Sequence, residues 1–236
     1  MSMRRNFVFI GAPSTGKGSF GKKVALQLGY KHISLGKLIR DEVSRNTSLG
    51  QSIQGLVETG SLVPDTIANS LALNIMQDDN RFVGTEDKIY VPVIFDGYPR
   101  TIDQAITLKK SFPKHEFVAV NIMLEKWVAV EKCLGRRTCM NCNRGFNVTD
   151  IQTGGFNMPS ILPDPSTCPL GPSICEPNLT TRKDDLSKII IEKRYDEYLK
   201  KTTPLLNFYK LKNLLRNFTV KKGMEDTDEL IRLMMF

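Results

Sequence analysis

The stretch from Phe7 to Ser19 has the residue types and spacing of a phosphate-binding loop. Its sequence is FVFIGAPSTGKGS, in which four apolar residues precede Gly11 and the run Gly16-Lys17-Gly18 follows. Backbone N–H groups of such a loop surround a phosphate at the start of a helix, and the lysine reaches the β- and γ-phosphates of a triphosphate. The alternative is a glycine-rich turn that binds no ligand. We expect phosphate contacts from Ser14, Thr15, Gly16, Lys17, Gly18 and Ser19.

A second chemical signal is Asp96, which ends the apolar run 93–95. A carboxylate at the carboxyl end of a strand beside a phosphate-binding loop orients Mg²⁺ or its water molecules. Ser19 offers a hydroxyl one position later than the strict motif, which places it directly after the lysine. The sequence therefore predicts Mg²⁺ near Asp96 and Ser19, held largely through water.

The third signal is a group of cysteines. The chain has five, an odd number that argues against a secreted disulfide scaffold and indicates a reducing compartment. Cys139 and Cys142 have zinc-knuckle spacing, whereas six residues separate Cys168 from Cys175. Two interpretations stay open for these four residues, a structural Zn²⁺ or free and packed thiols. We expect the fifth, Cys133, to lie in the core.

The elements that must position these groups follow from the apolar pattern. Strands are predicted at residues 7–10, 93–95, 116–124 and 218–220, and helical periods at 18–28, 67–76 and 227–234. Ser34 is a candidate cap for a further helix, and Gly60 a helix stop. Residues 138–179 are rich in glycine and proline and have no sustained period, which is typical of a functional lid or a disordered segment. At 236 residues the chain forms one domain with insertions, or at most two.

Bulk composition limits the class of protein. Apolar residues make up 41% and charged residues 25%, as in ordinary globular proteins, and no apolar run is long enough to span a membrane. The net charge of +8 has no block of like charges, which favours a phosphate-lined cleft over a nucleic-acid-binding face. We expect a cytoplasmic monomer that binds small nucleotides and neither nucleic acid nor membrane. The mitochondrial matrix is the alternative compartment.

The string FDGYPRTIDQA at residues 95–105 is the most specific one after the loop. Together with G-x-P-x-x-G-K-G-[ST], it resembles the adenylate kinase family, and four motifs follow the family order from Asn6 to about Tyr209. The resemblance implies an α/β fold, a P-loop NTPase-type parallel five-stranded sheet flanked by helices. It implies one domain, with a core of residues 1–33, 64–134 and 186–236, a helical monophosphate-binding insertion at 34–63 and a lid insertion at 135–185.

The resemblance also assigns site residues. The implied AMP-binding residues are Leu35, Arg40, Leu62, Val63, Gly97, Arg100, Gln104, Arg182 and Arg194. Besides the loop, Lys132, Arg136 and Phe146 would contact the donor nucleotide. Lys17, Arg100, Arg136, Arg182 and Arg194 would act on the transferring phosphoryl group, and Asp184 and Asp185 would bind arginines and hydrated Mg²⁺.

Several positions depart from the family pattern. Ser14 stands at a usual glycine, Leu35 at a threonine, Lys37 at an acidic residue and Lys132 at an arginine. One extra residue precedes Arg194, so that Lys193 is a rival for its part. Leu35 removes a hydroxyl beside the acceptor base, and a lysine lacks the planar guanidinium that stacks on a donor base.

The activity implied is reversible, Mg²⁺-dependent transfer of the γ-phosphoryl group of ATP or GTP to AMP. An attacking phosphate oxygen needs no general base, which agrees with two histidines, His32 and His115, that show no partner pattern. A non-catalytic nucleotide-binding protein with the same fold is the first alternative. A zinc-ribbon nucleic-acid binder is the second, although it leaves FDGYPRTIDQA unexplained.

Overall fold

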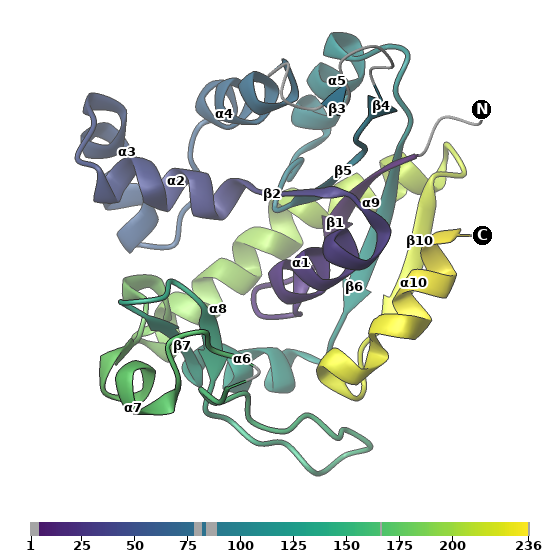
Figure 1. The fold of residues 1–236 in the computed structure, drawn as a ribbon. Helices are drawn as coiled ribbons and strands as arrows, with labels where there is room; N and C mark the ends of the chain where they lie inside the picture. Colours follow the sequence, from purple (N-terminus) through teal and green to yellow (C-terminus); the bar gives the residue numbers. More distant parts are fainter. Residues whose placement is uncertain (1–4, 78–81, 84–88, 166, 236) are drawn as a thin grey trace.

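A five-stranded parallel sheet forms the centre of the molecule (Figure 1). The structure, a computed structural model, describes residues 5–77, 82–83, 89–165 and 167–235. The strands are β1 (Asn6–Ile10), β2 (Lys31–Ser34), β5 (Val93–Asp96), β6 (Phe117–Met123) and β10 (Leu215–Thr219), in the order β10-β6-β1-β5-β2. The predicted α/β fold with a five-stranded parallel sheet is confirmed.

Edge strand β2 is the one strand that the apolar pattern did not locate. It pairs in parallel with β5, so that Ile33 lies opposite Phe95 and Ser34 opposite Asp96. Of its four residues only Ile33 is fully buried. A short strand covered on one side carries no apolar run, and its pairing with β5 therefore leaves little trace in the sequence.

Helices cover both faces of the sheet because alternate residues of each strand point to opposite sides. Val8 and Ile10 pack with α5 (Ile102–Ser111) and α9 (Thr203–Lys210). Phe7 and Phe9 pack with α1 (Lys17–Leu28), α6 (Lys126–Leu134) and α10 (Thr227–Met235). Helix α8 (Lys188–Glu197) continues through the π-helical turn Tyr198–Thr202 into α9. These buried layers hold the loop after β1 on a rigid support.

A helical insertion follows β2. It contains α2 (Leu35–Ser44) and α3 (Ser48–Glu58), after which α4 (Asp65–Gln77) returns to the core. Ser34 occupies the cap position of α2, but its side chain makes no capping hydrogen bond and donates instead to Asp96. The predicted position of Ser34 at the start of this helix is confirmed, but its side chain does not form a capping hydrogen bond. Two short strands, β3 (Phe82–Val83) and β4 (Ile89–Tyr90), form an antiparallel pair before β5.

The glycine- and proline-rich segment folds into a second, smaller unit. Strands β7 (Arg136–Cys139), β8 (Gly145–Asn147) and β9 (Leu179–Thr180) form an antiparallel sheet, and α7 (Pro172–Cys175) lies beside it. Two short 3₁₀ turns, Glu176–Asn178 and Lys183–Asp185, lead to α8. Within the described residues no helix is long and apolar enough to cross a membrane.

Residues 147–161, which we call the arm, leave this small sheet as a hairpin. Isolated bridges join Asn147 to Ile161 and Ile151 to Met158. The arm reaches the start of α10 (Figure 1), where Asn157 N–H donates to Lys221 O at 3.0 Å. Its apolar side chains belong to the same buried cluster as β6 and α10. The small unit is thus attached to the core at a second point.

Candidate active site

The loop between β1 and α1 closes tightly around the side chain of Lys17. Its Nζ donates to Gly11 O at 2.8 Å, to Ala12 O at 2.6 Å and to Thr15 Oγ1 at 3.4 Å. A Cβ on Gly11 would lie 2.5 Å from Ile122 O, and Gly16 has a φ of 88°. Both positions therefore require glycine. The ammonium group sits inside a ring of backbone atoms at the start of a helix, as the sequence predicts.

The charge of Lys17 is strongly influenced by its surroundings. Its pKa is lowered to about 7, chiefly by burial; Asp96 opposes this shift, and the nearby guanidinium groups of Arg100, Arg136 and Arg194 contribute to it. These four residues come from β5, the turn after it, β7 and α8. Arginines that are far apart in the sequence therefore meet in front of the loop.

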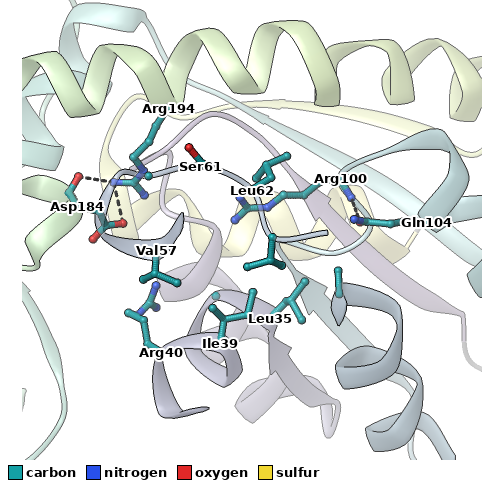
Figure 2. Close-up of a pocket in the computed structure, with 14 residues that line it drawn as sticks. Leu35, Ile39, Arg40, Val57, Ser61, Leu62, Arg100, Gln104, Asp184 and Arg194 are labelled. Atoms are coloured by element: carbon teal, nitrogen blue, oxygen red, sulfur yellow. Dashed lines mark hydrogen bonds and ion pairs between the residues drawn. The ribbon is translucent and has the colours of Figure 1, made fainter. Parts of the chain in front are cut away.

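A pocket of about 610 Å³ opens beside this meeting point (Figure 2). Its end toward Gln104 carries the apolar side chains of Leu35 and Leu62 (Figure 2), and Ile39, Val57, Val63 and Ala68 complete the apolar lining. The other end carries Arg40, Arg100 and Arg194, with Asp184 beside Arg194. A ligand with a flat apolar body and an anionic group matches this arrangement.

Three of the guanidinium groups have no carboxylate partner among the described residues. Arg40 and Arg182 make no side-chain hydrogen bond or ion pair there, and Arg100 donates only to Gly97 O, at 3.1 Å. Burial lowers the pKa of all three, and neighbouring arginines lower it further; the pKa of Arg182 falls to about 9. Asp96, Asp184 and Asp185 oppose these shifts from a distance but form no ion pair with the three side chains within the described residues. A cluster of partly buried cations without paired carboxylates is a site for a strongly anionic ligand.

Two aspartates organise the remaining cations. Asp185, which is 1% exposed, lies 2.6 Å from Arg194 Nη1 through Oδ1 and 3.2 Å from Arg136 Nη1 through Oδ2. Asp184 Oδ2 lies 3.1 Å from the same atom of Arg194. Lys193 points outward and donates to Ser61 Oγ at 3.2 Å. The structure therefore brings Arg194, and not Lys193, to the site.

Asp96 lies where β5 ends, against the first turn of α1. A Cβ on Gly18 would lie 3.0 Å from Asp96 Oδ2, which accounts for the glycine after the lysine. Ser34 Oγ donates to the same oxygen at 3.1 Å, and His32 Nε2 lies 3.9 Å from it. The sequence shows no partner pattern for His32, whereas pairing of β2 with β5 brings its side chain near Asp96; its Nε2 makes no hydrogen bond within the described residues. Burial lowers the pKa of His32, which keeps the imidazole neutral.

Gln104 is a buried pocket residue whose amide is held at both ends. Its Oε1 accepts from Arg100 N–H at 2.7 Å, and its Nε2 donates to Asp65 Oδ1 at 2.8 Å. The sequence analysis missed Asp65. An acidic residue in the first turn of a helix is ordinarily explained by the helix dipole, so that no separate signal marked it.

Two predicted donor residues lie elsewhere. Lys132 is 6% exposed, and its Nζ donates to the carbonyl oxygens of Thr149, Met158 and Pro159 in the arm at 2.8, 2.7 and 3.3 Å. Phe146 is 3% exposed and packs against the lid cysteines. The structure brings neither side chain to the phosphate-binding loop.

Ser14 connects the loop to the lid. Its φ of 60° lies in the left-handed region, which explains why a glycine suits this position. Its Oγ accepts a hydrogen bond from Arg136 Nη2. The sequence analysis did not predict this contact, because it marked Ser14 only as a departure from the family's usual glycine.

The four lid cysteines meet in a small core of their own. Cys142 Sγ lies 3.7 Å from the Sγ atoms of both Cys168 and Cys175, and Cys139, Cys142 and Cys175 lie within 4.8 Å of one another. Sulfur atoms around a tetrahedral Zn²⁺ with Zn–S bonds of about 2.3 Å are about 3.8 Å apart. All five cysteines are free thiols, and Cys133 is buried in α6 as predicted.

A parallel α/β sheet with a phosphate-binding loop, a convergent set of arginines and an adjoining pocket defines a P-loop phosphotransferase. The sequence comparisons agree with this class. The family model described as adenylate kinase matches residues 9–214. The chain belongs to the adenylate kinase family, and its activity is that of a nucleoside monophosphate kinase.

Relatives match over almost the whole chain. A GTP:AMP phosphotransferase of Plasmodium falciparum is 34% identical over 229 residues, which are 97% of this chain and 95% of that protein. Adenylate kinase 1, chloroplastic, of Arabidopsis thaliana is 35% identical over 94% of this chain and 74% of its own length. The adenylate kinase of Borrelia duttonii is 32% identical over 94% and 93%. These relatives support phosphotransfer and do not favour a non-catalytic role.

Proposed function

We propose that this chain transfers the γ-phosphoryl group of ATP or GTP to AMP in the 610 Å³ pocket and the adjoining loop. The observation that carries the proposal is the set of partly buried guanidinium groups that have no carboxylate partner within the described part of the chain. Arg40 and Arg100 lie at the charged end of the pocket, and Arg182 lies in the field of Arg136 and Arg40. Two phosphates that face each other supply the negative charge that these groups lack.

In this proposal each part of the site has one task. The loop and Lys17 hold the β- and γ-phosphates of the donor, and Arg136 approaches them from the lid side. Arg40 and Arg100 hold the phosphate of AMP, while the apolar end of the pocket takes the base. Arg182 and Arg194 neutralise charge on the phosphoryl group in transfer. Lys132 and Phe146 are left out of the donor site, because their side chains are used inside the protein.

Mg²⁺ is part of the proposal. One carboxylate oxygen of Asp96 is bonded to Ser34, and the other makes no hydrogen bond within the described residues. Ser19 is exposed on the adjoining turn of α1. One carboxylate, one hydroxyl, water and phosphate oxygens form a donor set that suits Mg²⁺. The ion would neutralise charge on the donor phosphates.

The experiment is a coupled assay of diphosphate formation with purified protein. ATP, GTP, CTP and UTP are each offered as donor with AMP, CMP, GMP and UMP as acceptors, with Mg²⁺ and with excess chelator. We expect turnover with AMP and with ATP or GTP, and none after chelation. No diphosphate from any pair that contains AMP contradicts the proposal.

We also propose that the four lid cysteines hold a structural Zn²⁺. The sulfur separations near 3.7 Å support this, and free packed thiols are the alternative. Metal analysis of the purified protein should give about one zinc per chain. Cys175→Ser should lower this content and the melting temperature, whereas Cys133→Ser, a buried cysteine outside the cluster, should leave the zinc content unchanged. Zinc-free protein with native stability contradicts the site.

A further inference from the structure

The amide of Gln104 is fixed in one orientation by the two groups beside it. Its Oε1 accepts the backbone N–H of Arg100 at 2.7 Å, and its Nε2 donates to Asp65 Oδ1 at 2.8 Å. Asp65 is itself held, since Thr101 Oγ1 donates to its Oδ2 at 2.8 Å. Gln104 is 3% exposed, so that water does not replace these partners.

This arrangement forbids rotation of the amide by 180°. A rotated Gln104 would place its NH₂ group against the N–H of Arg100, two donors together, and its oxygen against the Asp65 carboxylate, two acceptors together. A primary amide has two donor hydrogens and two acceptor lone pairs. One of each is used by the protein, and one of each is left for a ligand in the pocket that Gln104 lines.

The remaining pair of hydrogen-bonding groups distinguishes purines. A base with a 6-amino group presents an N–H donor beside the N1 acceptor, which matches a fixed amide oxygen beside a fixed N–H. A base with a 6-oxo group presents an acceptor beside an N1–H donor, the reverse pattern. Such a base fits only the rotated amide, in which two buried groups lose their partners. Discrimination is large when a site leaves buried polar groups unpaired with the wrong ligand.

Apart from Gln104, the side chains near the apolar end of the pocket offer few hydrogen-bonding groups to the base. Leu35, at 3% exposure, lines the pocket with a side chain that neither donates nor accepts. Ser61 also lines it, but its Oγ accepts from Lys193 Nζ and lies 3.2 Å from Thr59 Oγ1. Base recognition in this pocket therefore depends on the orientation of one amide.

We propose that Asp65 is a positioning residue that makes the acceptor site selective for 6-aminopurine over 6-oxopurine monophosphates. It acts through Gln104 and does not touch the reacting phosphates. The inference rests on the proposed function, because it assumes that the base of AMP lies at the apolar end of the pocket.

The test compares AMP with IMP, which differ at this edge of the base, using the same donor. Wild-type protein should favour AMP in kcat/KM. Asp65→Asn supplies an amide that pairs with Gln104 in either orientation, so that only the backbone N–H of Arg100 still opposes rotation and the AMP/IMP ratio should fall by about tenfold. Asp103→Asn is the matched control, since Asp103 is exposed in the first turn of α5 and makes no side-chain contact with Gln104 within the described residues. Its ratio should equal that of wild type.

The outcomes separate cleanly. A merely structural role of Asp65 would lower kcat/KM for both monophosphates and leave their ratio unchanged, which overturns the inference while the proposed function stands. Wild-type protein without activity on AMP overturns both. If Asp65→Asn does not fold, Gln104→Leu provides the second test. Its AMP/IMP ratio should approach one, and a ratio equal to that of wild type overturns the inference.

Discussion

The acceptor pocket and the body of the lid, residues 137–180, use their polar groups in opposite ways. In the pocket, the partly buried Arg40 makes no hydrogen bond or ion pair within the described residues, and Arg100 donates only to Gly97 O. In the lid, Arg137 donates to the carbonyl oxygens of Leu134 and Arg136, and Arg144 to that of Thr167. Neither lid arginine has a carboxylate partner within the described residues, but both are held by backbone carbonyl groups, whereas Arg40 has no such partner. The presence of an arginine alone therefore does not identify a ligand site. An arginine whose guanidinium group has no partner in the protein is the better indicator.

The largest effect is expected from Arg100→Ala. Arg100 lies between the pocket and Lys17, and its guanidinium makes one hydrogen bond, to Gly97 O. Removal of one preorganised cation from a charge-stabilising site lowers kcat by about 10²–10³. The melting temperature should change little, because the side chain is not part of the apolar core. Steady-state kinetics and thermal unfolding measure both.

Arg45→Ala is the control for the Arg100 experiment. Arg45 is exposed at the end of α2 and pairs with Glu42. Its kcat should stay within about twofold of wild type, because exposed ion pairs contribute little. A near-normal rate for Arg100→Ala would remove the distinction between unsatisfied and satisfied arginines on which the site assignment depends.

The residues that the sequence assigns to the acceptor side line one pocket, whereas the path of the arm was not predicted, and the difference has a physical reason. A phosphate-binding loop and a string such as FDGYPRTIDQA fix local geometry through glycine, proline and a few polar residues, so that spacing predicts position. The lid has no such local code. Contacts such as that between Lys132 Nζ in α6 and Met158 O in the arm depend on the path that the arm takes through the structure. No periodicity in the sequence indicates that path.

Asp65 was missed for the same reason. Its role depends on Gln104, 39 positions away in the sequence, and each residue has an ordinary local explanation. The substitution of lysine for arginine at position 132 was read as a weaker donor contact. The structure indicates a different use, since a lysine inserts a compact cation between three carbonyl oxygens where a planar guanidinium would not fit as readily.

An effect of intermediate size, on stability rather than on activity, is expected from Lys132→Met. If Lys132 is scaffold, its loss removes three hydrogen bonds that hold the arm on the core. We expect a loss of about 2–3 kcal/mol in the free energy of unfolding, because charged hydrogen bonds are worth about 1.5–3 kcal/mol. The melting temperature should fall by about 5–10 °C. The KM for the donor triphosphate should change by less than about threefold.

The opposite result is equally informative. A rise of more than about tenfold in donor KM with unchanged stability would place Lys132 in the donor site and contradict its assignment to the scaffold. Lys126→Met is the matched control, because Lys126 lies in the same helix with an exposed side chain over the ring of Tyr195. We expect it to alter neither quantity.

The smallest effect concerns the proton of Lys17. Burial and the surrounding arginines hold its pKa at about 7, and the phosphates of a bound triphosphate should raise it. At pH 8 most Lys17 side chains are neutral before binding and charged after it, so that binding should take up close to one proton. At pH 6 the group is already charged, and the uptake should be close to zero. Calorimetry in two buffers of different ionisation enthalpy measures the difference.

The control must separate Lys17 from the nucleotide, whose terminal phosphate also titrates. Lys17→Met keeps the nucleotide contribution and removes that of the lysine, so that its proton uptake at pH 8 should be lower than that of wild type by close to one. Equal uptake in the two proteins would mean that Lys17 is charged before the ligand arrives. In that case the arginines around the site would not lower the pKa of Lys17. Their positive charge would then act only on a ligand that contacts them and not on the lysine of the loop.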